Sequence, residues 1–234
     1  MAEKNKLEVQ LETAKKAELA AGNKLLGMYN SNIESWRDRE YTWVVDPLDG
    51  TRDFIDKTGH FGILIGLTFN GFPVLGINYY PAKDVFYYAV INEGAYKKQG
   101  HNVQRISASS TSEVESMIMV KGRSQKHSNL LDKIIEAEKL KMPLIVGTIA
   151  LKICKVTEGD ADFFLCTSSP QSYFHLWDVC SSQPIIQEAG GMLTDLNGNT
   201  LSYRPYDEPK VEKSILISNG KNHGQILEMI KKYV

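Results

Sequence analysis

An aromatic and β-branched run, YTWVVDPLDGTRDF at residues 41–54, ends in two aspartates three residues apart. Aromatic and β-branched residues favour strands, so the run predicts a short buried strand over 42–46. Pro47 and the glycine after Asp49 then predict two changes of chain direction. The side chains of Asp46 and Asp49 should therefore point into one small volume at the carboxyl end of the strand.

Two carboxylates held this close repel each other, and a divalent cation removes that penalty. Oxygen ligands alone suit Mg²⁺. Thr51 is predicted to cap a short helix that starts at Arg52, which would place the N–H groups of Gly50 and Thr51 where helix starts bind phosphate. The motif predicts metal on one side and phosphate on the other. The alternative is that D-P-L-D-G is only a double turn.

The composition is that of an ordinary globular protein: 234 residues, 42% apolar and 24% charged, with a formal net charge of −1. That charge gives no support for a nucleic-acid or membrane partner. The basic segment KGRSQKH at 121–127 is either a solvated face or a contact for an anion. Cys154, Cys166 and Cys180 lack metal spacing and suit a reducing compartment. With no apolar segment near either targeting or membrane-spanning length, we expect a cytoplasmic protein.

The order of the predicted elements indicates one domain over residues 1–234 with two lobes, about 1–106 and 107–234. An amphipathic helix is predicted over 6–27, followed by an antiparallel meander over 61–106. Strands and helices alternate after 107, which is typical of an α/β half. The expected strands there are MIMV, PLIVG, ADFFLC, MLTDL and SILISN, and the expected helices are SNLLDKIIEAEKL, IALKICKVTEG and DVCSSQPIIQEAGG.

A second acidic stretch, HLWDVCSSQPIIQEAGGMLTDLNG at residues 175–198, repeats the order of bulky aromatic, acid and helix. Asp178 is predicted at the helix N-terminus, where a carboxylate either caps the helix or holds an ion. Pro184 falls inside this helix, so its first turn should be irregular.

Together, WVVDPLDGTRDF and LWDVCSSQPIIQEAGG resemble the two signatures of the inositol monophosphatase superfamily. The members of that superfamily are magnesium-dependent, lithium-sensitive phosphomonoesterases. FNGFPVLGINYYPAKDVFYYAVINEGAY looks like the β-meander of that family. GTIALKICKVTEGDADFF is similar to the stretch before the second signature in 3′(2′),5′-bisphosphate nucleotidases. The resemblance implies an α/β (α+β) fold, a layered αβαβα sandwich of the sugar phosphatase type, with a meander lobe and a mixed-sheet lobe.

The resemblance also implies a metal site for two or three Mg²⁺ ions. One ion would be held by Glu34, Asp46 and the Leu48 carbonyl and would lower the pKa of the attacking water. Another would be held by Asp46, Asp49 and Asp178 and would stabilise the leaving oxygen. The resemblance therefore implies that Glu34, Asp46 and Thr51 are catalytic.

The implied substrate is a small phosphate monoester. Gly50 and Thr51 would hold its phosphate, while Thr148 and Lys152 fall where nucleotidases of the family contact a second phosphate, and His175 would shape the pocket. These positions favour 3′-phosphoadenosine 5′-phosphate, with an inositol monophosphate as the alternative and histidinol phosphate as a third. Lys152 could equally be a solvated helix residue.

One departure from the family pattern concerns the segment before the first signature. The chain runs from Asn30 directly to Ile33 and Glu34, where family members have a segment resembling SPVTEAD and a second long helix. That segment supplies an aspartate which, with the threonine equivalent to Thr51, activates the water. A catalytically impaired protein that still binds metal and phosphate is therefore a further hypothesis. Relatives are often dimers, so the resemblance also carries the expectation of a homodimer.

Overall fold

The structure is a computed structural model, in which the described residues are 40–123, 128–168, 173–204, 210–211 and 214–234. The predicted helix over 6–27 and the candidate ligand Glu34 lie outside these residues. Among the helices of the described residues, none combines the length and the apolar character needed to cross a membrane.

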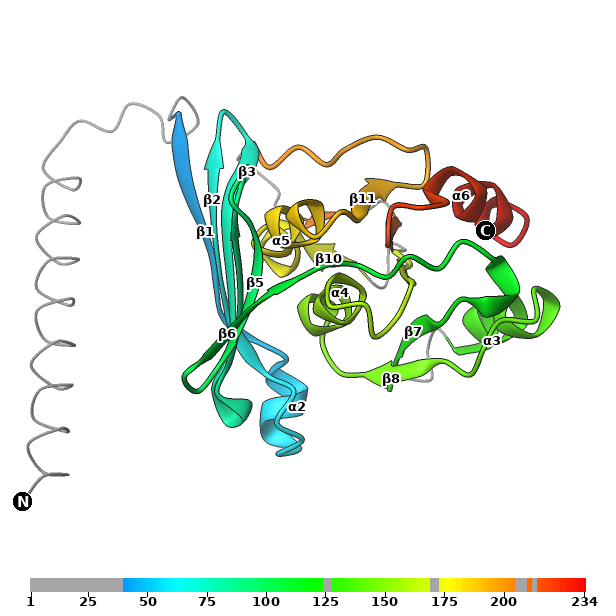
Figure 1. Cartoon of the computed structure of the whole chain (residues 1–234), viewed down its shortest axis with the longest axis horizontal. Coiled ribbons are helices and arrows are strands. Elements are labelled where there is room, and N and C mark those ends of the chain that lie inside the picture. The colour runs from blue at the N-terminus through cyan, green and yellow to red at the C-terminus, as the bar shows by residue number, and fades with distance from the viewer. Residues whose placement is uncertain (1–39, 124–127, 169–172, 205–209, 212–213) are drawn as a thin grey trace, which may run out of the picture. The chain divides into compact units, whose positions relative to one another are not determined.

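The first part of the described chain forms a six-stranded antiparallel sheet in which neighbouring strands follow one another in sequence (Figure 1). This confirms the predicted meander and the hairpin that closes it. The strands are β1 (Tyr41–Asp49), β2 (Gly62–Phe69), β3 (Phe72–Tyr80), β4 (Val85–Val90), β5 (Gly94–Gln99) and β6 (Asn102–Ile106). β1 is longer than predicted, because it pairs with β2 beyond Asp46 and resumes at Asp49 after an irregularity in register.

The second sheet has five strands in the order β11-β13-β9-β7-β8. β7 pairs in parallel with β8 and β9, whereas β13 pairs antiparallel with β9 and β11, so the sheet is mixed. Its strands are β7 (Met119–Gly122), β8 (Leu144–Val146), β9 (Phe163–Cys166), β11 (Met192–Asp195) and β13 (Ile215–Ser218). A short pair, β10 (Phe174–His175) with β12 (Lys210–Val211), was not predicted.

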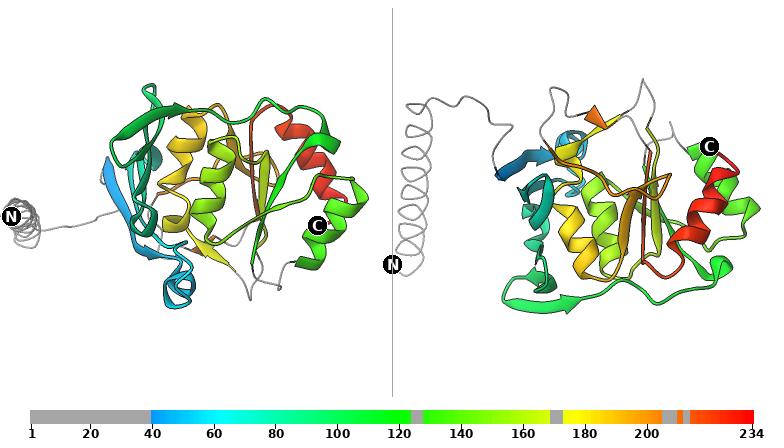
Figure 2. Two further views of the ribbon diagram at one scale, coloured as in Figure 1. Left: turned by 60° about the horizontal axis from the view of Figure 1, so that its bottom comes forward. Right: turned by 90° about the horizontal axis from the view of Figure 1, so that it is seen from above.

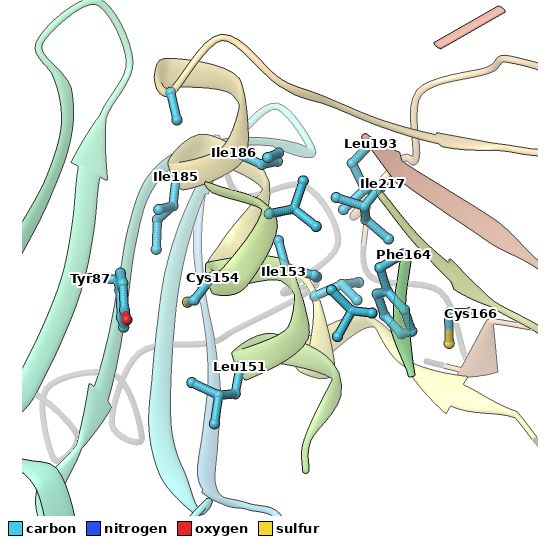
Figure 3. Close-up of a cluster of buried hydrophobic side chains, with 14 of the residues drawn as sticks. Tyr87, Leu151, Ile153, Cys154, Phe164, Cys166, Ile185, Ile186, Leu193 and Ile217 are labelled. Carbon is cyan, nitrogen blue, oxygen red and sulfur yellow. The ribbon is translucent and has the colours of Figure 1, made fainter. Parts of the chain in front are cut away.

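Helices fill the space between the sheets and cover the far face of the second sheet (Figures 1 and 2). They are α3 (Ser128–Ala137), α4 (Ile149–Thr157), α5 (Ser182–Glu188) and α6 (His223–Lys231). α4 and α5 lie between the sheets, and their apolar side chains form the larger core with residues such as Tyr87, Phe164 and Ile217 (Figure 3). α3 and α6 pack on the other side of the second sheet in a separate core. The described chain therefore has the layers of an α/β sandwich.

Two local predictions are wrong. The segment from Asp178 is not one continuous helix, because a 3-10 turn, η5 (Leu176–Asp178), precedes α5. The irregular start expected for this helix is therefore present, and Pro184 lies in the first turn of α5, where its missing N–H needs no partner. Thr51 does not cap the helix after the first signature, because α2 (Thr51–Ile55) already includes it and the N-cap is Gly50. α6 was not predicted.

The outer face of the meander sheet, away from α5, is rich in apolar side chains. Tyr41, Trp43 and Phe72 are 58%, 61% and 57% exposed. Leu67 and Phe69 of β2 pair across the strands with Trp43 and Tyr41, so the patch is continuous. Within the described ranges, no helix covers this face (Figure 1).

Candidate metal and phosphate site

Three carboxylates from distant parts of the sequence meet at the carboxyl end of β1. One oxygen from each of Asp46, Asp49 and Asp178 lies within 4.8 Å of the others. Asp46 and Asp49 come from β1, and Asp178 comes from η5, which contacts β1 and β2. The packing of η5 on the meander sheet therefore builds the cluster.

The end of β1 is shaped so that both of its aspartates face the same space. The Leu48 N–H donates to Asp46 Oδ1 at 3.0 Å, and the Thr51 hydroxyl lies 3.4 Å from the Leu48 carbonyl oxygen as a donor. Gly50 has a φ of 80°, a conformation that glycine adopts without strain. A Cβ at Gly50 would overlap the methyl group of Thr148 and lie 2.8 Å from the His60 carbonyl oxygen. The turn therefore requires glycine.

Asp178 is held in place by the chain just before it. The His175 N–H donates to Asp178 Oδ2 at 2.7 Å, and the His175 Nδ1 lies 3.9 Å from the same oxygen. The imidazole of His175 stacks on Trp177, with ring centroids 4.2 Å apart and an interplanar angle of 7°. Asp178 thus caps the η5 turn and is also a member of the acid cluster. The sequence had left capping and ion binding open as alternatives for this residue.

The three carboxylates of the cluster are only partly balanced by nearby positive charge. Asp49 is 7% exposed, and its Oδ2 is buried with no hydrogen-bond partner among the described residues. Burial raises the pKa of Asp49 to about 7; the charges of Asp178 and Asp46 add to this, while Thr148 and Lys152 act against it. Burial and the Asp46 charge also raise the pKa of Asp178. A cation at the cluster would relieve this repulsion and give the unpartnered oxygen a ligand.

The start of α4 lies beside Asp49 and contributes a buried hydroxyl and a buried ammonium. Thr148 caps the helix by accepting a hydrogen bond from the Leu151 N–H at 3.2 Å. Lys152 is 9% exposed, and its Nζ lies 5.0 Å from the ring centroid of Phe164. Burial lowers the pKa of Lys152, and nearby carboxylates including that of Asp49 oppose this. The interpretation of Lys152 as a solvated helix residue is therefore wrong.

A second polar group next to the cluster was missed by the sequence analysis. Arg123 donates from Nη1 to Asp53 Oδ1 at 2.9 Å, and its Nη2 lies 2.8 Å from His60 Nδ1. The hydroxyl of Thr58 donates to the same Asp53 oxygen at 2.5 Å. Because arginine only donates, the Nδ1 of His60 is the acceptor. The basic segment at 121–127 was the only signal, since nothing in the sequence pairs Arg123 with the first signature.

The predicted site residues fall into three groups. The structure brings Asp46, Asp49 and Asp178 together, with Leu48, Gly50, Thr51, Thr148, Lys152 and His175 around them. Glu34 is outside the described residues. The roles assigned to all of these residues stay predictions.

The chain is similar to characterised proteins over most of its length. The model of the inositol monophosphatase family matches residues 7–234. The 3′(2′),5′-bisphosphate nucleotidase CysQ of Buchnera aphidicola is 31% identical over 174 residues, covering 74% of this chain and 62% of that protein. The fructose-1,6-bisphosphatase/inositol-1-monophosphatase of Thermotoga maritima is 28% identical over 194 residues, which cover 82% of this chain and 68% of that protein. The structure of an inositol monophosphatase from Anabaena (Nostoc) sp. PCC 7120 matches with a TM-score of 0.70 at 25% identity, and the match covers 84% of this chain and 74% of that one.

Proposed function

The chain belongs to the inositol monophosphatase family, and we propose that it is a magnesium-dependent hydrolase of small phosphate monoesters. The single observation that carries this proposal is the buried Oδ2 of Asp49, which has no hydrogen-bond partner among the described residues and lies inside a cluster of three carboxylates. Such an arrangement is costly without a cation and is well suited to a hard one.

The carboxylates of Asp46, Asp49 and Asp178 would hold the metal, completed by the Leu48 carbonyl and Glu34. When bound, Mg²⁺ supplies a Lewis acid that lowers the pKa of water and stabilises charge on phosphate oxygens. Because the capping hydrogen bond from His175 fixes Asp178, that carboxylate is positioned before any ligand arrives.

The remaining residues would bind and orient the phosphate. The main-chain N–H groups of Gly50 and Thr51 lie at the start of α2 and would donate to phosphate oxygens. The Thr51 hydroxyl, beside the Leu48 carbonyl, would orient the attacking water. The buried ammonium of Lys152 would attract a negatively charged substrate toward Asp49.

We favour 3′-phosphoadenosine 5′-phosphate as the substrate, because Thr148 and Lys152 are buried beside the cluster and a similar protein is a bisphosphate nucleotidase. An inositol monophosphate is the second candidate, supported by the names of other similar proteins. The proposal includes inhibition by lithium, a single catalytic domain, a cytoplasmic location and a homodimer.

Phosphate release measures this proposal directly. We expect wild-type protein to release phosphate from the favoured bisphosphate nucleotide with Mg²⁺ and to lose this activity in excess chelator. Asp46→Asn should lower kcat/KM by about 100-fold or more, because it removes a metal ligand. Asp56→Asn is the matched control: this aspartate lies just after α2 and makes only an exposed pair with Arg52.

Calorimetric Mg²⁺ binding separates an active enzyme from an impaired family member. Wild type that binds Mg²⁺ but releases no phosphate from bisphosphate nucleotide, inositol monophosphate, fructose bisphosphate or histidinol phosphate would be a binding protein. Equal hydrolysis by wild type and Asp46→Asn would show that the proposed metal site is wrong.

A further inference from the structure

A cavity of about 320 Å³ lies between the end of the meander and α4, and three lysines line it. Lys83 comes from the turn after β3, Lys97 from β5 and Lys155 from α4. The side chains of Tyr80, Tyr87 and Leu151 also line it and are buried. We call this cavity the lysine pocket.

Two of the three lysines are fixed by one buried acid. Glu158 accepts from Lys97 Nζ at 2.5 Å, and it also accepts from Lys155. The hydroxyl of Tyr87 donates to Glu158 at 3.0 Å, and Lys155 donates to Asp160 at 2.9 Å. Glu158 therefore accepts hydrogen bonds from three donors of the protein, and the two ammonium groups are held at the pocket.

Lys83 adds a positive charge that no acid in the described part of the chain neutralises through an ion pair. Among the described residues it makes no ion pair, whereas Arg123 nearby is paired with Asp53. Burial lowers the pKa of Lys83, and the charges of Lys155, Arg123 and Lys97 lower it further, while Glu158 opposes them. A free lysine placed among other cations is electrostatically unfavourable unless an anion joins them.

The lysine pocket and the acid cluster are both bordered by residues of the same helix, α4, and its N-cap. Thr148 and Lys152 interact with Asp49, while Leu151 and Lys155, each three residues further on, line the lysine pocket. Residues three apart differ by about 4.5 Å in height along a helix. The lysine pocket is therefore close to the cluster but formed by different side chains.

We propose that the lysine pocket binds a phosphate group through Lys83, Lys97 and Lys155. The phosphate is either the second phosphate of a bisphosphorylated substrate or that of a separate phosphorylated molecule. This binding rests on the charges and volume of the pocket and does not require that the protein be a phosphatase.

The test is calorimetric titration of the full chain with inorganic phosphate in excess chelator, so that no metal at the acid cluster contributes. We expect wild type to bind phosphate and Lys83→Glu to bind at least about tenfold more weakly, because a charge-assisted contact becomes repulsive. Lys83→Gln should fall between them. Lys83 is exposed, so both variants should fold, which circular dichroism verifies.

Lys98→Glu is the matched control. Lys98 lies beside Lys97 on β5 but is exposed, does not line the pocket and sits over the ring of Phe86. It should bind phosphate like wild type. Absence of phosphate binding to wild type, or equal binding by wild type and Lys83→Glu, would overturn the proposal.

Steady-state kinetics with Mg²⁺ identify the source of the phosphate. If the pocket takes the second phosphate of a substrate, Lys83→Glu raises KM for a bisphosphate nucleotide about tenfold and leaves KM for a monophosphate unchanged. If a separate molecule binds there, KM for both substrates is unchanged. A protein without activity would refute the proposed function but leave the binding result intact.

Discussion

His223 is a buried histidine whose two ring nitrogens both face hydroxyl groups. Thr194 Oγ1 donates to the Asp195 carbonyl at 2.8 Å, so it accepts from His223 Nε2, which is 2.7 Å away. The other nitrogen, Nδ1, lies 2.8 Å from Ser218 Oγ and accepts a hydrogen bond from that hydroxyl when the ring is neutral. Burial lowers the pKa of His223 below its ordinary value near 6.5. The neutral ring therefore stabilises the packing of α6 on the second sheet.

This predicts a loss of stability in acid. A histidine with a lowered pKa in the folded state takes up a proton on unfolding, so its contribution is complete above pH 6.5 and declines as pH falls below that value. We expect the free energy of unfolding of wild type to fall between pH 7 and pH 5 more steeply than that of His223→Gln, by up to about 1.4 kcal/mol per pH unit. Urea titrations at several pH values measure this, and parallel pH dependences would contradict it.

Asp49 is the residue at which metal removal should have the clearest effect. Its raised pKa means that the charged form is disfavoured in the metal-free fold, so the cost of ionising Asp49 grows as pH rises from about 4 to about 7 and stays at its full value above that. In chelator at pH 8, Asp49→Asn should be more stable than wild type by about 1–4 kcal/mol. In Mg²⁺ the order should reverse, because only wild type binds the ion at this position.

Chemical denaturation of both proteins with and without Mg²⁺ tests the reversal. Asp56→Asn, an exposed aspartate, should differ little from wild type in either condition. If Asp49→Asn were less stable than wild type in chelator as well, the charge of Asp49 would not destabilise the metal-free fold, and the prediction would be wrong.

At the scale of elements, two paired glycines let the chain before α5 approach the meander sheet. Gly66 of β2 lies opposite Gly76 of β3. A Cβ at Gly76 would overlap the Ser181 carbonyl oxygen, and one at Gly66 would lie 2.7 Å from Cys180 Sγ. Asn78 continues the contact, because Ser181 Oγ donates to its Oδ1 at 2.5 Å. This close contact sets the position of the segment that carries Asp178.

Gly76→Ala should therefore move that segment away from the sheet. We expect a loss of about 2–4 kcal/mol in the free energy of unfolding, because the added methyl group would clash with the backbone of Ser181. Gly224→Ala is the control, since nothing lies within 4 Å of its added Cβ and alanine favours the helix α6. Calorimetric Mg²⁺ binding should weaken in Gly76→Ala alone; unchanged binding and stability would show that the contact does not position Asp178.

At the scale of the whole molecule, the acid cluster joins parts of the chain that belong to different layers. Asp46 and Asp49 end a strand of the meander sheet, whereas Asp178 lies in the segment leading to α5, a helix between the sheets (Figure 1). A ligand that bridges them binds only the folded chain. Metal binding should thus stabilise the molecule as a whole and not only the loop after β1.

The expected result is a concentration-dependent rise in Tm with Mg²⁺. At about 100 times Kd the ion adds about 2.7 kcal/mol, which corresponds to about 5–10 °C for a chain of this size. Asp178→Asn should lose most of this rise, because it removes the carboxylate from the second layer. Thermal unfolding followed by circular dichroism measures the shift, and a full Mg²⁺ response in Asp178→Asn would contradict a bridging ion.

The sequence alone determined the features that depend on residues close to one another along the chain. Alternation of apolar residues and the turn residues between them predicted the meander, because strand pairing in hairpins is local. The identity of the candidate metal-binding acids also came from the two signatures. Local rules failed at Thr51 and at the start of α5, where the backbone of Gly50 and the η5 turn follow from packing against α4 and the meander sheet.

Only the tertiary structure decided which side chains outside the two signatures meet and which are removed from water. The distance within which the three carboxylates lie, the burial of Lys152 and the pairing of Arg123 with Asp53 all depend on how segments distant in the sequence pack together. Side-chain periodicity reports which face of an element is apolar but not which partner that face meets. For this reason, the three aspartates and their shared site could be predicted from the resemblance carried by the two signatures, whereas the burial of Lys152 and the partner of Arg123 required the packed sheets.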